Sequence, residues 1–319
     1  MITSYPTACP TDLAVRRLIV AAGQAASVNN TQPWRFRVLH GELVELLADW
    51  DRWLRVSDPR GRSLHVSCGA ALLNLRVAAR AAGRMPGVRL LPDPDRRPDL
   101  LAVTQIALRG RSSAESRELY DLIPVRRTSR MPFHDRPVPE AVLAELRAAA
   151  ALERARLIVL DRRAAMDVLD HAAIAEDELA RDEEYVAELR AWTGGRGVPP
   201  YVQGPVASGR VDPVRDFGRR RGEACFEPYP QLAVLTTAGD GPLDWLRAGQ
   251  ALQRVLLVAA GREVSASFLN QPLDLRDMRR RADPRTRHGH PQMILRLGYG
   301  PVVARAPRRP VGDLVMAEN

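Results

Sequence analysis

The sequence predicts an α+β fold made of two related halves, each with a central mixed sheet flanked by helices. Helical and strand periodicities alternate along the 319 residues, and they do so in two series. Two apolar helical segments, residues 69–83 and 249–261, both open with Gly-x-Ala-Leu and close at a glycine. Each is followed by a strand, a proline-bearing loop and a strand ending at Gly110 or Gly298. We interpret this as an internal repeat.

The first series of elements is predicted from the spacing of its apolar residues and from the turn-forming residues between them. An Ala- and Leu-striped helix gives way to the polar stretch 26–33, whose Asn, Thr and Pro favour turns. Trp34, Phe36 and Val38 alternate with two arginines, which indicates a strand with one buried face. Gly83 is a plausible end for the long apolar helix. In chain order we expect a helix at 12–25, strands at 34–38 and 42–48, a helix at 63–82, and strands at 88–91 and 100–108.

The second series begins after a basic, irregular segment at 124–137. We expect a helix at 139–150, a strand at 156–160, one long charged helix at 162–191, a strand at 231–237, a helix at 243–260, and strands at 263–269 and 292–298. Residues 193–230 are rich in Gly, Pro and Arg and show no periodicity. Such a long irregular stretch is either a functional lid or a disordered insertion, and we take it as a candidate lid.

Composition excludes several classes of protein. Apolar residues make up 45% and charged residues 27%, as in globular domains. No apolar run approaches the roughly 18 residues of a membrane helix. The first residues show no signal-peptide pattern, so we expect a cytoplasmic protein without a membrane partner. The three cysteines lie far apart, and His288-Gly289-His290 has no nearby ligand at metal-binding spacing. We therefore expect no metal site.

Positive charge is concentrated near the C-terminus. All 47 basic residues are arginine and the net charge is +9. Residues 276–309 hold ten arginines against Asp277 and Asp283. This stretch could be a solvated face, hold an anionic cofactor or bind nucleic acid, in that order of preference. No helix-turn-helix, RNA-recognition or zinc pattern accompanies the charge, so we do not expect a nucleic-acid partner.

Two polar segments could carry chemistry. No GxGxxG or GxxxxGK[ST] motif is present, which removes the common nucleotide loops. The segment 27–34, Ser-Val-Asn-Asn-Thr-Gln-Pro-Trp, lies at a helix-to-strand junction. The carboxamide of Asn30 can both donate to and accept from the edge of a pyrimidine-like ring, and Ser27 and Thr31 add hydroxyls. An Asx-rich capping loop is the alternative interpretation.

The second segment is Arg126-Arg127-Thr128-Ser129-Arg130. Three guanidinium groups and two hydroxyls within five residues suit a phosphate, because guanidinium forks donate charge-assisted, bidentate hydrogen bonds. A solvated linker between the two halves would have a similar composition.

Together the segments resemble the two signatures of the FMN-dependent nitroreductase-like flavoproteins. That family opens with R-R-S-x-R-x-F, which binds the FMN phosphate, and then reads P-S-x-x-N-x-Q-P-W. Residues 126–133 (RRTSRMPF) and 26–34 (ASVNNTQPW) are similar to these signatures but occur in reverse order, one in each half. Family homodimers build each flavin site from both subunits. The chain therefore resembles the Acg-type branch, in which one chain mimics the dimer and keeps one site.

The resemblance extends over most of the chain and implies a nitroreductase-like fold. It includes residues 58–83, 268–279 and 290–301 and the pair Arg308-Arg309. It implies a half at 1–122 carrying the NTQPW loop and a half at 123–319 carrying the phosphate segment and the candidate lid. Ala26 replaces the family's Pro, Thr128 replaces its Ser, and the family's acidic-Gly pair is absent near Asn270. None of these changes removes a donor needed for the phosphate.

Transferred residue by residue, the resemblance implies an FMN site. The phosphate would be held by Arg126, Thr128 and Arg130, with Arg308 or Arg309 approaching from the C-terminal segment. Ser27, Asn30 and Thr31 would reach the ring, and the backbone at Asn270 and Gln271 would lie near flavin N5. No side chain is expected to be catalytic in itself, because the flavin carries the chemistry.

The implied function is an FMN-binding oxidoreductase. Reduced nicotinamide would be the electron donor and a small organic molecule the acceptor. The alternative is a flavin-sequestering protein whose closed lid leaves little or no turnover. An internal pseudo-dimer removes the usual reason to dimerise, so we expect a monomer or a weak dimer.

Overall fold

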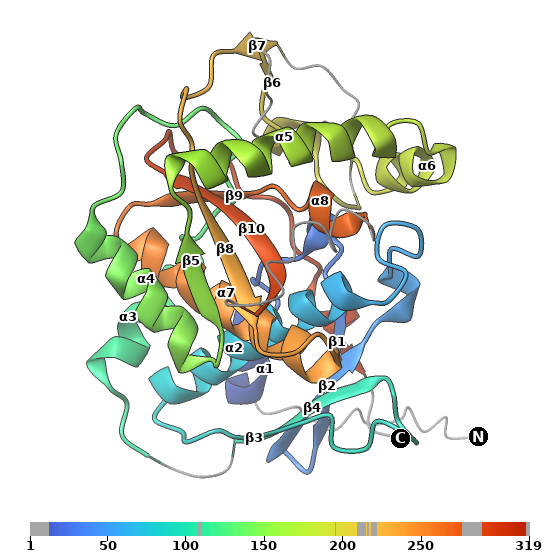
Figure 1. Ribbon diagram of the computed structural model, residues 1–319. Coiled ribbons are helices and arrows are strands. Elements are labelled where there is room, and N and C mark those ends of the chain that lie inside the picture. The colour runs from blue at the N-terminus through green and yellow to red at the C-terminus, as the bar shows by residue number, and fades with distance from the viewer. Residues whose placement is uncertain are drawn as a thin grey trace.

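The computed structural model contains two larger, separate sheets, with helices between and around them (Figure 1). The first sheet is mixed and comes mainly from the first half of the chain, and the second sheet is antiparallel and comes from the second half. It describes residues 13–106, 110–194, 196–208, 215, 217, 222–275 and 289–316. Within these residues, no helix combines the length and apolar character that a membrane crossing requires.

The first sheet has the strand order β11-β1-β2-β4-β3. Its strands are β1 (Trp34–Leu39), β2 (Leu43–Ala48), β3 (Gly87–Leu90), β4 (Leu100–Gln105) and β11 (Val315–Met316). The second sheet has the order β5-β8-β10-β9. Its strands are β5 (Arg156–Val159), β8 (Gln231–Thr237), β9 (Ser265–Phe268) and β10 (His290–Gly298). A small parallel pair joins β6 (Val206–Ala207) to β7 (Glu223–Ala224).

The helices follow the same repeat. They are α1 (Leu13–Ala22), α2 (Arg62–Ala81), α3 (Ala114–Leu122), α4 (Glu140–Leu152), α5 (Arg162–Leu179), α6 (Glu183–Ala191), α7 (Pro242–Gly261), α8 (Gln271–Asp274) and α10 (Val311–Leu314). Short 3₁₀ turns lie at Val28–Asn30, Trp50–Arg52 and Pro200–Val202. The order helix, strand, strand, long helix, strand, strand in the first half recurs as α4, β5, β8, α7, β9, β10 in the second.

Strand pairing confirms the predicted α+β fold of two related halves. In each sheet the first strand of the half pairs antiparallel with the second, the second with the fourth, and the fourth with the third. The order β1-β2-β4-β3 is therefore the same as β5-β8-β10-β9. The difference is β11, which follows β10 in sequence but pairs in parallel with β1 of the first sheet. The predicted boundary after residue 122 stays a prediction, and the chain crosses back to the first half beyond it.

The halves meet where α2 and α7 pack at a pair of glycines. A Cβ on Gly69 would lie 2.2 Å from the carbonyl oxygen of Leu246, and a Cβ on Gly249 would lie 2.0 Å from that of Val66. Leu246 precedes Gly249 by three residues, as Val66 precedes Gly69. The two contacts are thus equivalent under an internal two-fold relation. Only glycine permits such a close backbone approach.

Buried amides lock this interface. Asn74 of α2 and Gln253 of α7 are fully buried, and the Gln253 amide donates to Asn74 Oδ1 at 2.9 Å. Asn74 in turn donates to the Ala21 carbonyl, and Gln253 Oε1 accepts from the Ala26 amide at 3.2 Å. Polar groups buried this deeply require partners, so the network fixes how the loop after α1 faces the second half.

Two expectations about the elements change. The helix expected over 162–191 is two helices, because Asp182 accepts from the amides of Glu184 and Tyr185 and starts α6 anew. Between β4 and the basic segment, where no element was expected, α3 is capped by Ser113. The other expected helices and strands are present among the described residues to within a few residues at their ends, whereas the short elements α8, α10, β6, β7 and β11 were not expected.

The glycine pair yields a test of the interface. Gly249→Ala should lower the free energy of unfolding by about 1–3 kcal/mol or more, because its methyl group overlaps a backbone carbonyl that cannot swing away. Gly312→Ala is the control, since a Cβ there has no neighbour within 4 Å. Urea denaturation would measure both. Equal midpoints for the two variants would contradict the close packing.

Candidate functional site

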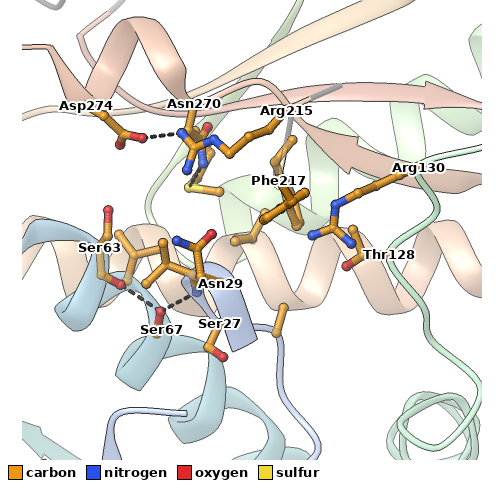
Figure 2. Close-up of a pocket in the computed structure, with 16 residues that line it drawn as sticks. Ser27, Asn29, Ser63, Ser67, Thr128, Arg130, Arg215, Phe217, Asn270 and Asp274 are labelled. Carbon is orange, nitrogen blue, oxygen red and sulfur yellow. Dashed lines mark hydrogen bonds and ion pairs between the residues drawn. The ribbon is translucent and has the colours of Figure 1, made fainter. Parts of the chain in front are cut away.

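A cavity lies between the halves, and we call it the inner cavity (Figure 2). The first half contributes the loop after α1 and the first turns of α2. The second half contributes the basic segment, α7, the end of β9, α8 and β10. The space between its lining residues, together with the solvent at its opening, amounts to about 740 Å³. Its lining residues are Ala26, Ser27, Val28, Asn29, Ser63, Val66, Ser67, Thr128, Arg130, Arg215, Phe217, Leu252, Phe268, Asn270, Asp274 and Met293.

A second cavity of about 490 Å³ adjoins the first, and we call it the arginine cavity. Ala26, Ser27, Thr128 and Arg130 line both cavities, so the two share a wall. The other lining residues are Asn30, Arg126, Arg127, Val198, Val202, Ala304, Arg305, Ala306 and Arg308. With Arg130, five of the residues that line this cavity are arginines, and among the described residues no carboxylate lines it. The composition favours an anionic ligand.

Arg126 is the most informative member of this set. It is 5% exposed, and its Nε and Nη1 have no hydrogen-bond partner among the described residues. Burial, and then the charges of Arg127 and Arg305, lower the pKa of Arg126 to about 10. A buried cation without a counter-ion is costly, so an arginine kept in this state indicates a missing anion.

Two more arginines are in a similar state. Burial and the charges of Arg126, Arg305 and Arg127 lower the pKa of Arg308 to about 9. Arg308 donates from Nη1 to Asn30 Oδ1 at 2.9 Å, and its buried Nε has no partner among the described residues. Burial and the charge of Arg215 lower the pKa of Arg130 to about 10. The mutual repulsion would be relieved by an anion placed among them.

The structure brings most of the predicted site residues together. Seven of them line one or both cavities: Ser27, Asn30, Arg126, Thr128, Arg130, Asn270 and Arg308. They come from four segments that are far apart in sequence. Their contacts with a flavin stay a prediction.

Three predicted residues line neither cavity. The Thr31 hydroxyl is fully buried and donates to the Val28 carbonyl at 2.9 Å, as part of the local turn. Gln271 is buried at the start of α8. Arg309 forms an ion pair with Asp49 at 3.0 Å and donates to the Trp34 carbonyl. Of the two candidate C-terminal arginines, Arg308 therefore lies at the cavity and Arg309 anchors the chain.

Sequence reasoning missed part of the inner cavity. Arg215 forms an ion pair with Asp274, and Tyr185, Asp274 and Glu176 raise its pKa despite its burial. Phe217 lies 5.0 Å under the Arg130 guanidinium. Both come from the aperiodic stretch 193–230, where no pattern could mark individual residues. On the opposite wall are Ser63 and Ser67, one helical turn apart at the start of α2, and that spacing was a usable signal (Figure 2).

Described parts of residues 193–230 contact the cavity walls directly. The Asn30 amide donates to the Gly197 carbonyl at 2.9 Å, and Arg130 donates to the Val202 carbonyl at 3.0 Å. Val198, Val202 and Phe217 form a small apolar cluster beside them. This segment therefore covers the arginine cavity, although its action as a lid stays a prediction.

The described residues form an internally duplicated α+β protein, and residues of both halves line two adjoining cavities. No family model matches the chain. Three Mycobacterium tuberculosis proteins align with nearly all of it. The one named "Putative NAD(P)H nitroreductase Rv3131" is 33% identical over 344 aligned residues, covering 99% of this chain and 93% of that protein. The chain belongs to this nitroreductase family.

The other two relatives span similar lengths. "Uncharacterized protein Rv3127" is 31% identical, with 94% of this chain and 92% of that protein covered. "Putative NAD(P)H nitroreductase acg" is 29% identical, with 97% of each covered. Among solved structures, an FMN-bound nitroreductase from Bacteroides fragilis superposes with a TM-score of 0.41 and 12% identity, covering 63% of this chain and 99% of that one. A likeness at this level transfers nothing to this chain.

The state of Arg126 predicts an unusual stability effect. Arg126→Met should raise the free energy of unfolding of the ligand-free protein by about 1–3 kcal/mol, because it removes a buried, unpaired charge. Arg254→Met is the matched control: Arg254 is equally buried but forms an ion pair with Glu153 at 2.8 Å, so its loss should destabilise the fold. Chemical denaturation would measure both. Destabilisation by Arg126→Met would mean that Arg126 has a structural role.

Proposed function

We propose that this chain binds FMN across the two cavities and acts as an oxidoreductase that takes electrons from reduced nicotinamide. The single observation that carries the proposal is Arg126, a buried guanidinium with unpartnered nitrogens in a cavity lined by five arginines and no described carboxylate. The relatives named NAD(P)H nitroreductase support the nicotinamide donor.

The arginine cavity fits a phosphate monoester. Arg126 offers two unpartnered donors, Arg308 offers one, and the Thr128 hydroxyl lines the same wall. A phosphate dianion has three terminal oxygens and accepts several charge-assisted hydrogen bonds. Binding would satisfy nitrogens that are otherwise buried without partners. It would also offset the burial and the like charges that lower the pKa of Arg126 and Arg308.

The inner cavity fits a planar, amphipathic ring. Val66, Leu252, Phe268 and Met293 give it apolar surface, and Asn29 adds a carboxamide. Apolar walls with a few polar groups are typical of sites that hold aromatic ligands in one orientation. Ser27, Thr128 and Arg130 line both cavities. A ligand with its ring in the inner cavity and its phosphate in the arginine cavity would therefore lie against these three residues.

When bound, FMN would supply the hydride chemistry, accepting from reduced nicotinamide and delivering to a small organic acceptor. The chain's own residues hold the cofactor and limit access of water. Asp274 is held by Arg215 and lies 3.7 Å from Arg62, so this carboxylate is committed to ion pairs. Asn270 Oδ1 accepts from the Ile294 amide at 2.9 Å, which fixes the turn between β9 and α8 at the cavity wall.

An anaerobic absorption spectrum, taken before and after adding NADPH or NADH, tests the proposal. A flavin band that bleaches with reduced nicotinamide is the expected result. A band that bleaches only with dithionite would overturn the oxidoreductase activity and favour flavin storage beneath a closed segment 193–230. No flavin band, even after incubation with FMN, would overturn flavin binding itself.

The phosphate assignment has its own test. Arg126→Ala with Arg130→Ala should give a folded but colourless protein, with FMN affinity lowered by at least about a hundredfold, because two charge-assisted contacts are removed. Arg156→Ala with Arg163→Ala, which removes two exposed arginines, should leave binding unchanged. Flavin fluorescence titration measures both. A double variant that stays fully loaded with FMN would show that the phosphate lies elsewhere.

A further inference from the structure

The loop at residues 29–32 has an unusual backbone. Asn29, Asn30 and Gln32 have positive φ angles of 43°, 56° and 51°, although none is glycine. This left-handed region is uncommon for such residues, and it persists only where surrounding contacts hold it. The contacts that hold this loop come largely from residues 304–310, which we call the C-terminal arm.

Two of the three carboxamide side chains of the loop, those of Asn30 and Gln32, bind the arm. The Asn30 amide donates to the Pro307 carbonyl at 3.1 Å, and Asn30 Oδ1 accepts from Arg308 at 2.9 Å. Gln32 Oε1 accepts from the main-chain amide of Arg309 at 2.9 Å, and Gln32 Nε2 reaches the Pro307 carbonyl at 3.5 Å. The peptide groups on both sides of Arg308 are therefore held by side chains of the first half.

Arg309 adds a second anchor. Its guanidinium pairs with the buried Asp49 at 3.0 Å and donates to the carbonyls of Gln32 and Trp34 at 3.0 and 3.1 Å. A few residues later β11 joins β1. Gln32, Asp49 and Arg309 line neither cavity, so none of them faces the space in which a ligand would lie.

We propose that Gln32 is a positioning residue, which acts with the Asp49–Arg309 pair to clamp the C-terminal arm and aim Arg308 into the arginine cavity. The proposal rests on the proposed function, since it concerns the phosphate of the same cofactor. Arg308 needs such a clamp, because it lines the same cavity as Arg126, Arg127 and Arg305, and these like charges oppose holding its guanidinium there. Without the clamp the arm would relax and carry Arg308 out of reach of the phosphate.

Residues of the segment 27–34 therefore have two different roles. Ser27 accepts from the Gln32 amide at 3.0 Å, and the Thr31 hydroxyl closes the turn on Val28. Ser27 faces the cavities, whereas Gln32 faces the arm. One short loop thus presents polar groups to the ligand and holds the segment that completes the ligand's other end.

Comparing FMN with riboflavin isolates this role, because riboflavin lacks the phosphate. Gln32→Leu should weaken FMN binding by about tenfold or more, the loss expected when the hydrogen bonds that fix a charged donor are removed. Riboflavin affinity should change less than twofold. Gln231→Leu is the matched control, since it removes a main-chain N–H to Oε1 bond of the same 2.9 Å length at Val138, away from both cavities. Neither affinity should change in that control.

A double-mutant cycle gives the second readout. Arg308→Met should weaken FMN binding, and adding Gln32→Leu should cause no further loss, because the clamp works only through Arg308. If Gln32→Leu does not fold, Asp49→Asn tests the same clamp and should show the same selective loss of FMN affinity.

The outcomes separate the two proposals. Equal weakening of FMN and riboflavin by Gln32→Leu, or a further loss on top of Arg308→Met, would overturn the positioning role while flavin binding stands. A wild-type protein that binds FMN no more tightly than riboflavin would overturn the phosphate site, and the positioning role with it.

Discussion

The close approach of α2 and α7 at Gly69 and Gly249 is the constraint on which the rest of the structure depends. A side chain at either glycine would meet a backbone carbonyl of the other helix. This contact lets Asn74 and Gln253 join across the interface, and Gln253 in turn holds the amide of Ala26. The loop of the first half is thereby set against the basic segment of the second, and the composite pocket follows from that placement.

The arginine cavity lowers the stability of the native state, because it holds cations that have no described counter-ion. Arg126 is buried and Arg308 is half-buried at the same cavity, and each has at least one nitrogen without a partner among the described residues. Burial and the charges of neighbouring arginines lower the pKa of both. A sequence selected only for folding would place apolar residues there, because a buried unpaired charge destabilises the native state. By contrast, Arg254 is buried just as deeply but has Glu153 as its partner. The difference between these arginines separates a ligand site from a structural ion pair.

Internal duplication with an asymmetric C-terminal addition accounts for the composite arginine cavity. The four strands of each half have the same order and sense, but β11 extends only the first sheet. The C-terminal arm that leads to β11 carries Arg308 past the loop at residues 29–32. The four strands that the two halves share therefore form the framework of the fold. The crossing of this one segment back to the first half completes the arginine cavity.

The sequence by itself determined most of the elements, the repeat and the two polar segments, because helix and strand periods and Gly-x-Ala-Leu are local patterns. It could not decide which polar residues face a ligand. Arg308 and Arg309 are adjacent and chemically identical, yet one lines the cavity and the other binds Asp49. Arg215 lies in a stretch without periodicity, yet it lines the pocket and forms an ion pair there with Asp274. Such choices depend on contacts between residues far apart in sequence, and only the tertiary structure brings those residues together.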